Sequence, residues 1–243
     1  MALSPAAFTA ALLEEARATH PWLHHPLFQL IYDGKLRREQ LQNVLRQQGC
    51  FFLDTIRHAA WKIISVGGYT PMWEDLERQR ALIPLVVEEG GEDTVGGKTT
   101  AHSFLFVRLC EALGISREAL FDTPYLPTTV IEKNELFTLQ RSSTLEALCG
   151  GNIATESINA VHTQRMAQAL ETHYGVAGEA LKFYHVHMEV EADHAERAVR
   201  IVARLAVSDA EQARGRLAMR RAIAARRICA DGMLAAFVDP GSA

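Results

Sequence analysis

Apolar residues recur every three to four positions along most of the chain, which is the period of amphipathic helices. No stretch alternates convincingly with the two-residue period of a strand, and no repeat of fixed length is present. Ser4 followed by Pro5 predicts an N-cap and the first position of a helix that runs to about Ala18. Further helices are predicted over residues 26–33, 37–66, 72–89, 101–113, 128–149, 151–173, 176–206 and 208–237. We therefore expect an all-α bundle of about seven to nine helices.

Glycine and proline clusters predict where these helices end, because glycine lowers helix stability and proline cannot continue a helix. The predicted breaks are Asp33–Gly34, Gly67–Pro71, the glycine-rich run 90–97, Asp122–Pro127, Gly150–Gly151 and Tyr174–Gly175.

The chain has 243 residues, of which 48% are hydrophobic, and no low-complexity or Pro/Ser-rich linker divides it. We expect one domain that spans residues 1–243. The net charge of −4 argues against nonspecific nucleic-acid binding. The first residues lack the basic region of a signal peptide, and no apolar run approaches the roughly 18 residues of a membrane span. We expect a cytoplasmic protein that binds neither nucleic acid nor membrane.

The four cysteines lie far apart, without Cys-x-x-Cys spacing, so neither a zinc knuckle nor a disulfide framework is indicated. We expect reduced thiols in the core at Cys50, Cys110, Cys149 and Cys229.

The segment from His187 to His194 places two histidines and Glu191 on one helical face. At about 100° per residue, these positions lie within about 60° of one another. Imidazole and carboxylate are ligands of non-haem iron, manganese and zinc, and a carboxylate that can bridge two ions favours a dinuclear iron or manganese site in a helical bundle. A solvated acidic helix face is the alternative, because further acidic residues lie nearby.

Two other segments carry side chains of the same ligand type. Glu156 lies among small and apolar residues, Gly-Gly-Asn-Ile-Ala-Thr-Glu-Ser-Ile-Asn-Ala, which predict a buried helix where an isolated carboxylate would be costly. His102 follows the acidic run 88–93 and opens the amphipathic stretch 103–113. His102 alone is typical of a helix N-terminus, but the three segments together provide what a carboxylate-bridged dimetal bundle requires.

Other residues have weaker candidate roles. His185 lies about 160° from His187 around the same helix, which predicts a surface position. A run of arginines from Arg197 to Arg227 predicts a solvated basic face, with attraction of an anionic substrate or an acidic partner as the alternative. The aromatic candidates for lining a pocket, or for ordinary core packing, are Phe106, Phe183 and Tyr184. The histidines to which no role is assigned from sequence are His58, His162 and His173.

Several segments, in this order, carry a resemblance to a known family: residues 25–42, the Glu-Glu-Gly-Gly run before His102, residues 109–120, Glu156 and the His-x-x-x-Glu-x-x-His motif. They resemble the haem-oxygenase-like diiron oxidases and oxygenases. That group is related in fold to TenA thiaminases and PqqC, and it includes the chlamydial CADD-type enzymes. The resemblance spans about residues 10 to 205 and implies a haem-oxygenase-like helical bundle.

The resemblance also implies a ligand set for two ferrous ions in each chain. The implied metal ligands are Glu88, His102, Glu156, His187, Glu191 and His194. Glu156 would be the bridging carboxylate and the catalytic residue, and Glu191 stands where aspartate is more usual. Dioxygen would be the co-substrate, with a small amino-bearing metabolite as substrate, an external electron donor and a homodimeric assembly. N-oxygenation or oxidative carbon–carbon cleavage is the reaction we expect.

The chain departs from the family pattern around the first carboxylate. Family members usually place this Glu three or seven residues before the first His, where this chain has threonine and valine. Glu88 lies fourteen residues before His102, and the intervening glycines oppose an unbroken helix. Glu89 and Glu92 are therefore alternatives to Glu88 as the ligand.

Three other classes of function stay open: a metal-free oxidase like PqqC, a TenA-like thiaminase or hydrolase, and a non-enzymatic binding protein. TenA thiaminases use a cysteine in the middle of the chain, but Cys149 lacks the aromatic neighbours of that site. The CADD-type enzymes that consume their own side chains use a tyrosine and a lysine, where this chain has Phe28 and His162. These two residues argue against self-sacrificing aminobenzoate formation.

Overall fold

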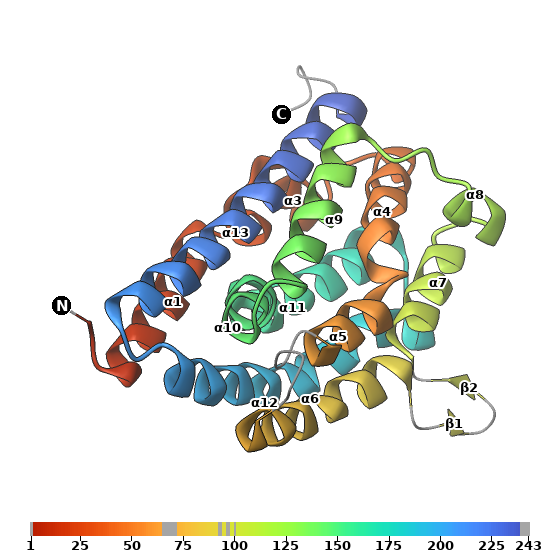
Figure 1. Cartoon of the computed structure of the whole chain (residues 1–243). Coiled ribbons are helices and arrows are strands. Elements are labelled where there is room, and N and C mark those ends of the chain that lie inside the picture. The colour runs from red at the N-terminus through yellow and green to blue at the C-terminus, as the bar shows by residue number, and fades with distance from the viewer. Residues whose placement is uncertain (1, 65–71, 92–93, 96–97, 100, 239–243) are drawn as a thin grey trace.

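The computed structural model describes residues 2–64, 72–91, 94–95, 98–99 and 101–238, without the side chains at positions 74, 88, 94–95, 98–99, 156 and 189–195. Helices make up almost all of this part of the chain (Figure 1). The all-α fold predicted from the hydrophobic pattern is confirmed. None of the described helices is both long enough and apolar enough to span a bilayer.

The first half of the chain contains α1 (Pro5–Thr19), α2 (Pro21–His24), α3 (Pro26–Tyr32), α4 (Arg38–Phe52), α5 (Thr55–Ile64) and α6 (Trp73–Gly90). The strands β1 (Thr94–Val95) and β2 (Lys98–Thr99) follow. The second half contains α7 (His102–Ala112), α8 (Arg117–Phe121), α9 (Pro127–Gln140), α10 (Thr144–Leu148), the π-helical turn η1 (Cys149–Ile153), α11 (Ala154–Tyr174), the 3-10 turn η2 (Gly178–Leu181), α12 (Lys182–Leu205) and α13 (Asp209–Phe237).

The N-terminal helices begin at prolines, as the sequence indicates for α1 and α3. His20 and His25 each precede a proline, and the Nδ1 atom of each accepts a hydrogen bond from the backbone N–H of the second residue in the helix that follows. These caps satisfy N–H groups that a helix start leaves without an intrahelical partner. The short helix α2 was not predicted, because one turn of helix shows no hydrophobic period.

The predicted helix 37–66 is two helices in the described structure. The chain turns at Leu53 and Asp54, between α4 and α5. No glycine or proline marks this turn, so local sequence gave no sign of it. The predicted break at Gly67–Pro71 lies outside the described residues.

The predicted break at Gly150–Gly151 is wrong, because the chain continues there through a π-helical turn that joins α10 to α11. A single π turn inserts one extra residue without ending the helix. Gly150 is required by packing rather than by a turn: a Cβ at this position would lie 2.7 Å from Cδ1 of Leu139 on α9. The actual end of the predicted helix 128–149 is the gap between α9 and α10.

The glycine-rich run ends α6 as predicted. Gly91 has a φ of 68°, a left-handed conformation that favours glycine. Thr94 and Val95 then pair with Thr99 and Lys98 in an antiparallel hairpin that projects away from the helices (Figure 1). The hydrophobic pattern predicts no strands, because two residues per strand are too few to show an alternating pattern.

The core consists of two clusters of buried residues, one with Phe28, Phe106 and Tyr184 at its centre and one with Phe8, Leu139 and Met219. The long helix α13 lies alongside α9 (Figure 1). The two backbones approach closely at Gly232, where a Cβ would lie 2.0 Å from Oγ1 of Thr128. This arrangement leaves a cavity between the helices of the second half and α5 and α6.

Candidate active site

A cavity of about 90 Å³ lies between α5, α6, α9, η1, α11, α12 and α13, with Trp22 of α2 and the end of α4 completing its wall. A single water occupies roughly 10–15 Å³ of such space, so the cavity has room for a small metabolite. Its polar lining side chains are Thr55, His58, Lys62, Glu89, Gln140, Thr155, Asn159, His187 and Arg226. A concave site in which apolar side chains and several polar groups converge is the usual form of a small-molecule site.

Two imidazoles and a carboxylate meet at one wall of this cavity. Oε2 of Glu89, at the end of α6, lies 3.0 Å from Nδ1 of His102, the first residue of α7. The rings of His102 and His187 have centroids 4.4 Å apart. Both histidines are buried, with 4% and 9% of their surface exposed. The turn that ends α6 and the start of α7 therefore bring together residues that lie thirteen positions apart.

The Glu89 carboxyl is ionised at neutral pH. Burial opposes its ionisation, but the neighbouring imidazoles of His102 and His187 and the Thr55 hydroxyl outweigh burial and lower the pKa of Glu89 to about 2. A buried anion of this kind needs cationic, hydrogen-bonding or metal partners. Glu89 is thus suited to hold a cation together with the two histidines.

His187 is oriented by a backbone contact within α12. Its Nδ1 lies 2.5 Å from the carbonyl oxygen of Phe183, one helical turn earlier. Because a carbonyl only accepts, Nδ1 carries the proton and Nε2 carries the lone pair. A backbone carbonyl on the far nitrogen is the arrangement found behind metal-binding histidines. Phe183 and Tyr184 are fully buried in a core cluster and do not line the cavity, so the core alternative holds for these two residues.

The described side chains do not form a complete metal site. Among them, no group of three or more His, Cys, Asp or Glu residues is arranged to hold a metal ion by itself. The donor types fit iron, since carboxylate oxygen and imidazole nitrogen are its usual protein ligands.

The other predicted ligands have side chains outside the described structure. Glu88 belongs to α6, Glu156 to α11, and Glu191 and His194 to α12, but their side chains are outside the described structure. Glu92 lies outside the described residues altogether. The assignment of these residues as ligands stays a prediction, and Glu89 is the member of the three acidic candidates whose carboxylate contacts His102.

Three other residues named in the sequence analysis, His185, Phe28 and His162, lie away from the cavity lining. His185 is exposed, as its position on α12 predicted. Phe28 and His162 pack edge to face with ring centroids 5.6 Å apart. His162 lies 2.7 Å from the Tyr32 hydroxyl, and burial lowers the pKa of this imidazole to about 3. His162 is therefore a neutral core residue, beside the cavity and not part of its lining.

Six polar residues of the cavity wall were not predicted from the sequence: Thr55, His58, Lys62, Gln140, Thr155 and Asn159. His58 and Lys62 lie on the same face of α5 as Thr55, so an apolar stripe interrupted by polar residues was the available signal. The solvated basic face predicted for the arginine run is wrong at Arg226, which is 3% exposed. Its guanidinium lies over the Trp22 ring, 3.3 Å from a carboxylate oxygen of Glu132 on α9. Only the packing of α13 against α9 decides which of these arginines is buried.

The four cysteines are unpaired and buried, as expected for core thiols. Cys149 does not line the cavity, and burial raises the pKa of its thiol to about 12. A thiol in this state is not a nucleophile at neutral pH, because the thiolate is the reactive form.

Comparison with known proteins identifies the family. Residues 42–227 match the family model described as iron-containing redox enzymes of the haem-oxygenase type. This match covers most of the chain, so the chain belongs to that family. A search of curated proteins gives no match.

Solved structures show the same fold. A CADD-like protein from Nostoc punctiforme superimposes with a TM-score of 0.76 at 16% identity, covering 97% of this chain and 99% of that one. A TenA homologue from Pseudomonas syringae pv. tomato gives a TM-score of 0.74 at 18% identity, covering 94% and 93%. A domain with a haem-oxygenase-like fold from Shewanella denitrificans gives 0.70 at 13% identity, covering 93% and 89%. The haem-oxygenase-like fold predicted from the sequence is confirmed; identities this low say nothing more specific about activity.

Proposed function

We propose that this protein is a non-haem diiron enzyme that activates dioxygen and oxidises a small amino-bearing metabolite, by N-oxygenation or by oxidative cleavage of a carbon–carbon bond. The observation that supports this proposal is the buried, ionised Glu89 beside His102 and His187 at the wall of a cavity between the helices. Membership of a family of iron-containing redox enzymes makes iron the metal to test first.

The proposed ligands are Glu89, His102, Glu156, His187, Glu191 and His194. Glu89 replaces Glu88 in this set because its carboxylate contacts His102. Glu191 and His194 follow His187 by four and seven residues on α12, a spacing that keeps one helical face. Glu156 lies one residue after Thr155 and three before Asn159, and both of these line the cavity. This sequence relation supports Glu156 as the bridging carboxylate.

Iron bound by these residues would supply the reduction of dioxygen, with electrons from an external donor. The protein itself orients the ligands and limits the access of water. The Phe183 carbonyl holds the His187 ring with its lone pair on Nε2. The apolar wall formed by Phe51, Phe52 and Leu85 limits the access of water to the reacting atoms. The cytoplasmic location expected from the sequence and the homodimer implied by the family resemblance also stay proposals, and sedimentation of the purified chain tests the latter.

Anaerobic loading with ferrous iron tests the function directly. We expect about two iron ions bound to each chain, and a transient visible absorption when the loaded protein meets dioxygen in a stopped-flow instrument. His187→Ala and His194→Ala should each lose iron while the bundle stays folded, because each removes a nitrogen ligand without opening a large cavity. Failure to bind iron, together with unchanged activity in Glu156→Ala, would move the protein to the metal-free oxidases or to the binding proteins.

A further inference from the structure

One face of α5 forms a polar wall along the cavity. Thr55, His58, Ala59 and Lys62 all line the cavity, and their spacing of three, four and seven residues places them on one side of the helix. Thr55 lies beside Glu89 at the candidate metal end. At 1.5 Å per residue, Lys62 lies about 10 Å farther along the helix axis. The wall therefore leads away from the candidate metal end over the length of a small metabolite.

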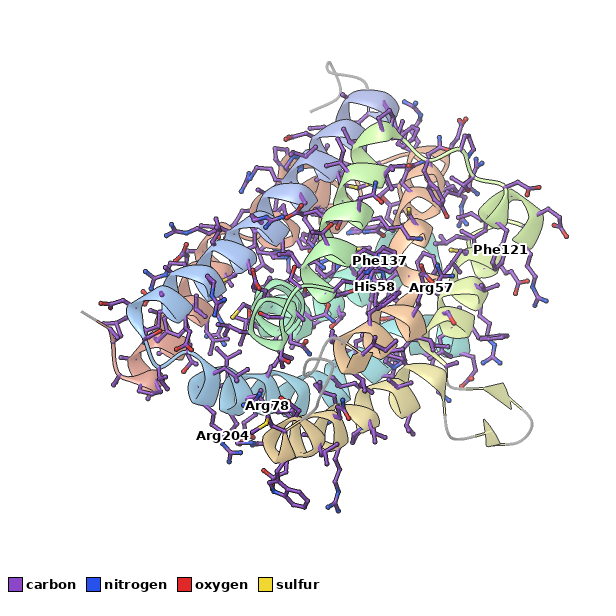
Figure 2. All side chains as sticks on the ribbon, in the orientation of Figure 1. Arg57, His58, Arg78, Phe121, Phe137 and Arg204 are labelled. Carbon is purple, nitrogen blue, oxygen red and sulfur yellow. The ribbon has the colours of Figure 1, made fainter. Side chains whose placement is uncertain are left out.

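His58 presents a hydrogen-bond acceptor to the cavity. Its Nδ1 lies 2.5 Å from Oε1 of Gln140, and because an amide oxygen only accepts, Nδ1 carries the proton and Nε2 the lone pair. The ring stacks on Phe137 with centroids 4.4 Å apart, and Figure 2 shows the two residues side by side between α5 and α9. His58 is 3% exposed, and Nε2 has no hydrogen-bond partner within the described part of the protein.

A buried acceptor without a partner is costly, so such an atom in a cavity wall indicates a group that donates to it. Burial also lowers the pKa of His58 to about 4. The imidazole is therefore neutral at physiological pH and keeps its lone pair.

Lys62 presents a cation one helical turn beyond His58. Among the described residues no carboxylate pairs with its ammonium group, whereas Arg226, the other cationic lining residue, already contacts Glu132. Gly151 of the π-helical turn faces Lys62, and a Cβ there would lie 3.6 Å from Nζ. Because glycine has no side chain, Gly151 leaves space for a ligand to reach the ammonium group.

We propose that His58 and Lys62 together bind the head group of an α-amino acid. Nε2 of His58 accepts a hydrogen bond from the amino group, and Nζ of Lys62 donates to the carboxylate. Cβ atoms four residues apart on a helix are about 6 Å from each other, which suits two groups borne by one carbon atom. The substrate side chain then extends past Thr55 to Glu89 and His187, so the nitrogen or the carbon–carbon bond that the proposed function oxidises belongs to the side chain and not to the head group. The direction of the side chain rests on the proposed function, while the recognition of the head group can be tested without iron.

Calorimetric titration of the full chain, iron-loaded without oxygen and again after chelation, tests this proposal. The ligands are straight-chain L-α-amino acids from alanine to norleucine, each compared with the carboxylic acid that lacks its amino group and the amine that lacks its carboxylate. At least one amino acid should bind roughly tenfold or more tighter than both of its analogues, since each head group adds a charge-assisted hydrogen bond. Equal affinities throughout the series would overturn the proposal.

Two variants separate the two contacts. In Lys62→Met, the affinity for the amino acid should fall to that for its amine analogue, and the affinity for the amine should not change. In His58→Phe, the affinity for the amino acid should fall to that for the carboxylic acid, and the affinity for the acid should not change. Arg57→Met is the matched control, because Arg57 lies on the same helix but is solvent-exposed and paired with Asp54, and it should change none of these affinities. Unchanged selectivity in both cavity variants would also overturn the proposal.

Nitrogen resonances of ¹⁵N-histidine-labelled protein give a second readout. The His58 signals, assigned by their loss in His58→Phe, should show an unprotonated Nε2 that shifts when the amino acid binds. A proton on Nε2 in the free protein would contradict the proposed acceptor. Iron binding measured on the same samples keeps the two proposals distinguishable. If the protein prefers an amino acid over its analogues but binds no iron, only the diiron function is rejected. If it binds iron but shows no such preference, only the head-group site is rejected.

Discussion

At the scale of single residues, the hydrogen-bond partner of each buried histidine fixes what that histidine can do. A backbone carbonyl holds the proton of His187 on Nδ1, and an amide oxygen does the same for His58. Both rings then present Nε2, His187 beside Glu89 and His58 farther along the same cavity. The two residues therefore have the same tautomer for different reasons and take different proposed roles.

The choice between neighbouring carboxylates can be tested by iron titration of Glu88→Ala and Glu89→Ala. We expect wild type to show two distinguishable iron affinities, and Glu89→Ala to lose the weaker one, because the Glu89 carboxylate contacts His102. Glu88→Ala should keep both and is the matched control. Tight and equal occupancy of both sites in the two variants would mean that neither residue is a ligand.

Buried neutral histidines make the metal-free protein sensitive to acid. Burial lowers the pKa of His58 to about 4 and that of His162 to about 3, below the value near 6.5 of an unfolded chain. The unfolded state therefore binds more protons, so stability is complete above about pH 6.5 and falls as the pH falls from there toward these lower values. Each histidine should account for a loss of roughly 2 kcal/mol between pH 7 and pH 5.

Urea unfolding at the two pH values measures this effect. His58→Gln should reduce the difference between pH 7 and pH 5 by roughly 2 kcal/mol, since it removes one such group. His185→Gln is the control, because His185 is exposed, and its pH difference should equal that of wild type. An unchanged difference in His58→Gln would show that His58 is not buried in its neutral form.

At the scale of elements, the π-helical turn η1 shapes the cavity. It carries the chain from α10 into α11 without a break, and it places Gly150 against α9 and Gly151 against the cavity. The two adjacent glycines thus have different surroundings. Gly150 faces Leu139 at a distance that excludes a methyl group, whereas Gly151 has room for one.

This contrast predicts opposite results for two adjacent substitutions. Gly150→Ala should destabilise the fold by about 1–3 kcal/mol, because the added methyl group would overlap Leu139. Gly151→Ala should change the free energy of unfolding by less than about 1 kcal/mol, since its Cβ would lie 3.5 Å from the nearest atom, Cε of Lys62. Urea midpoints of both variants check this expectation, and a larger loss in Gly151→Ala would contradict the described π turn.

At the scale of the whole molecule, helices from both ends of the sequence meet at one cavity, where Arg226 of α13 lies over the ring of Trp22 from α2. The CADD-like and TenA proteins to which the chain is similar share its overall fold at 18% identity or less. Because a fold does not define an activity, only the residues around the cavity can distinguish the classes of function.

The variant Cys149→Ser distinguishes a diiron enzyme from a TenA-like enzyme that depends on a cysteine nucleophile. Dioxygen consumption by iron-loaded protein should be nearly unchanged in this variant, because the Cys149 thiol is buried, protonated at neutral pH and outside the cavity lining. Oxygen-electrode rates for the variant and for wild type at equal iron content provide the measurement. Loss of turnover with unchanged iron binding would favour a TenA-like reaction instead.

The candidate site was only partly visible in the sequence. His102 and His187 could be identified because ligand-type side chains on separate helical segments point to a dimetal bundle, and the structure brings these two together. Glu89 could be named only as an alternative, since spacing does not show how α6 ends relative to α7. His58 and Lys62 were missed because a histidine and a lysine on an amphipathic helix occur commonly in proteins without such a cavity.

The sequence by itself determined the helical class, most helix ends and the ligand-type residues of α7 and α12, because hydrophobic period, proline and glycine act over a few neighbouring positions. Tertiary structure alone decided the turn between α4 and α5, the continuous helix through Gly150, the burial of Arg226 and the pairing of Glu89 with His102. Each of these depends on contacts between segments far apart in the chain. Such contacts set burial, and burial sets which protonation state and which tautomer a side chain adopts.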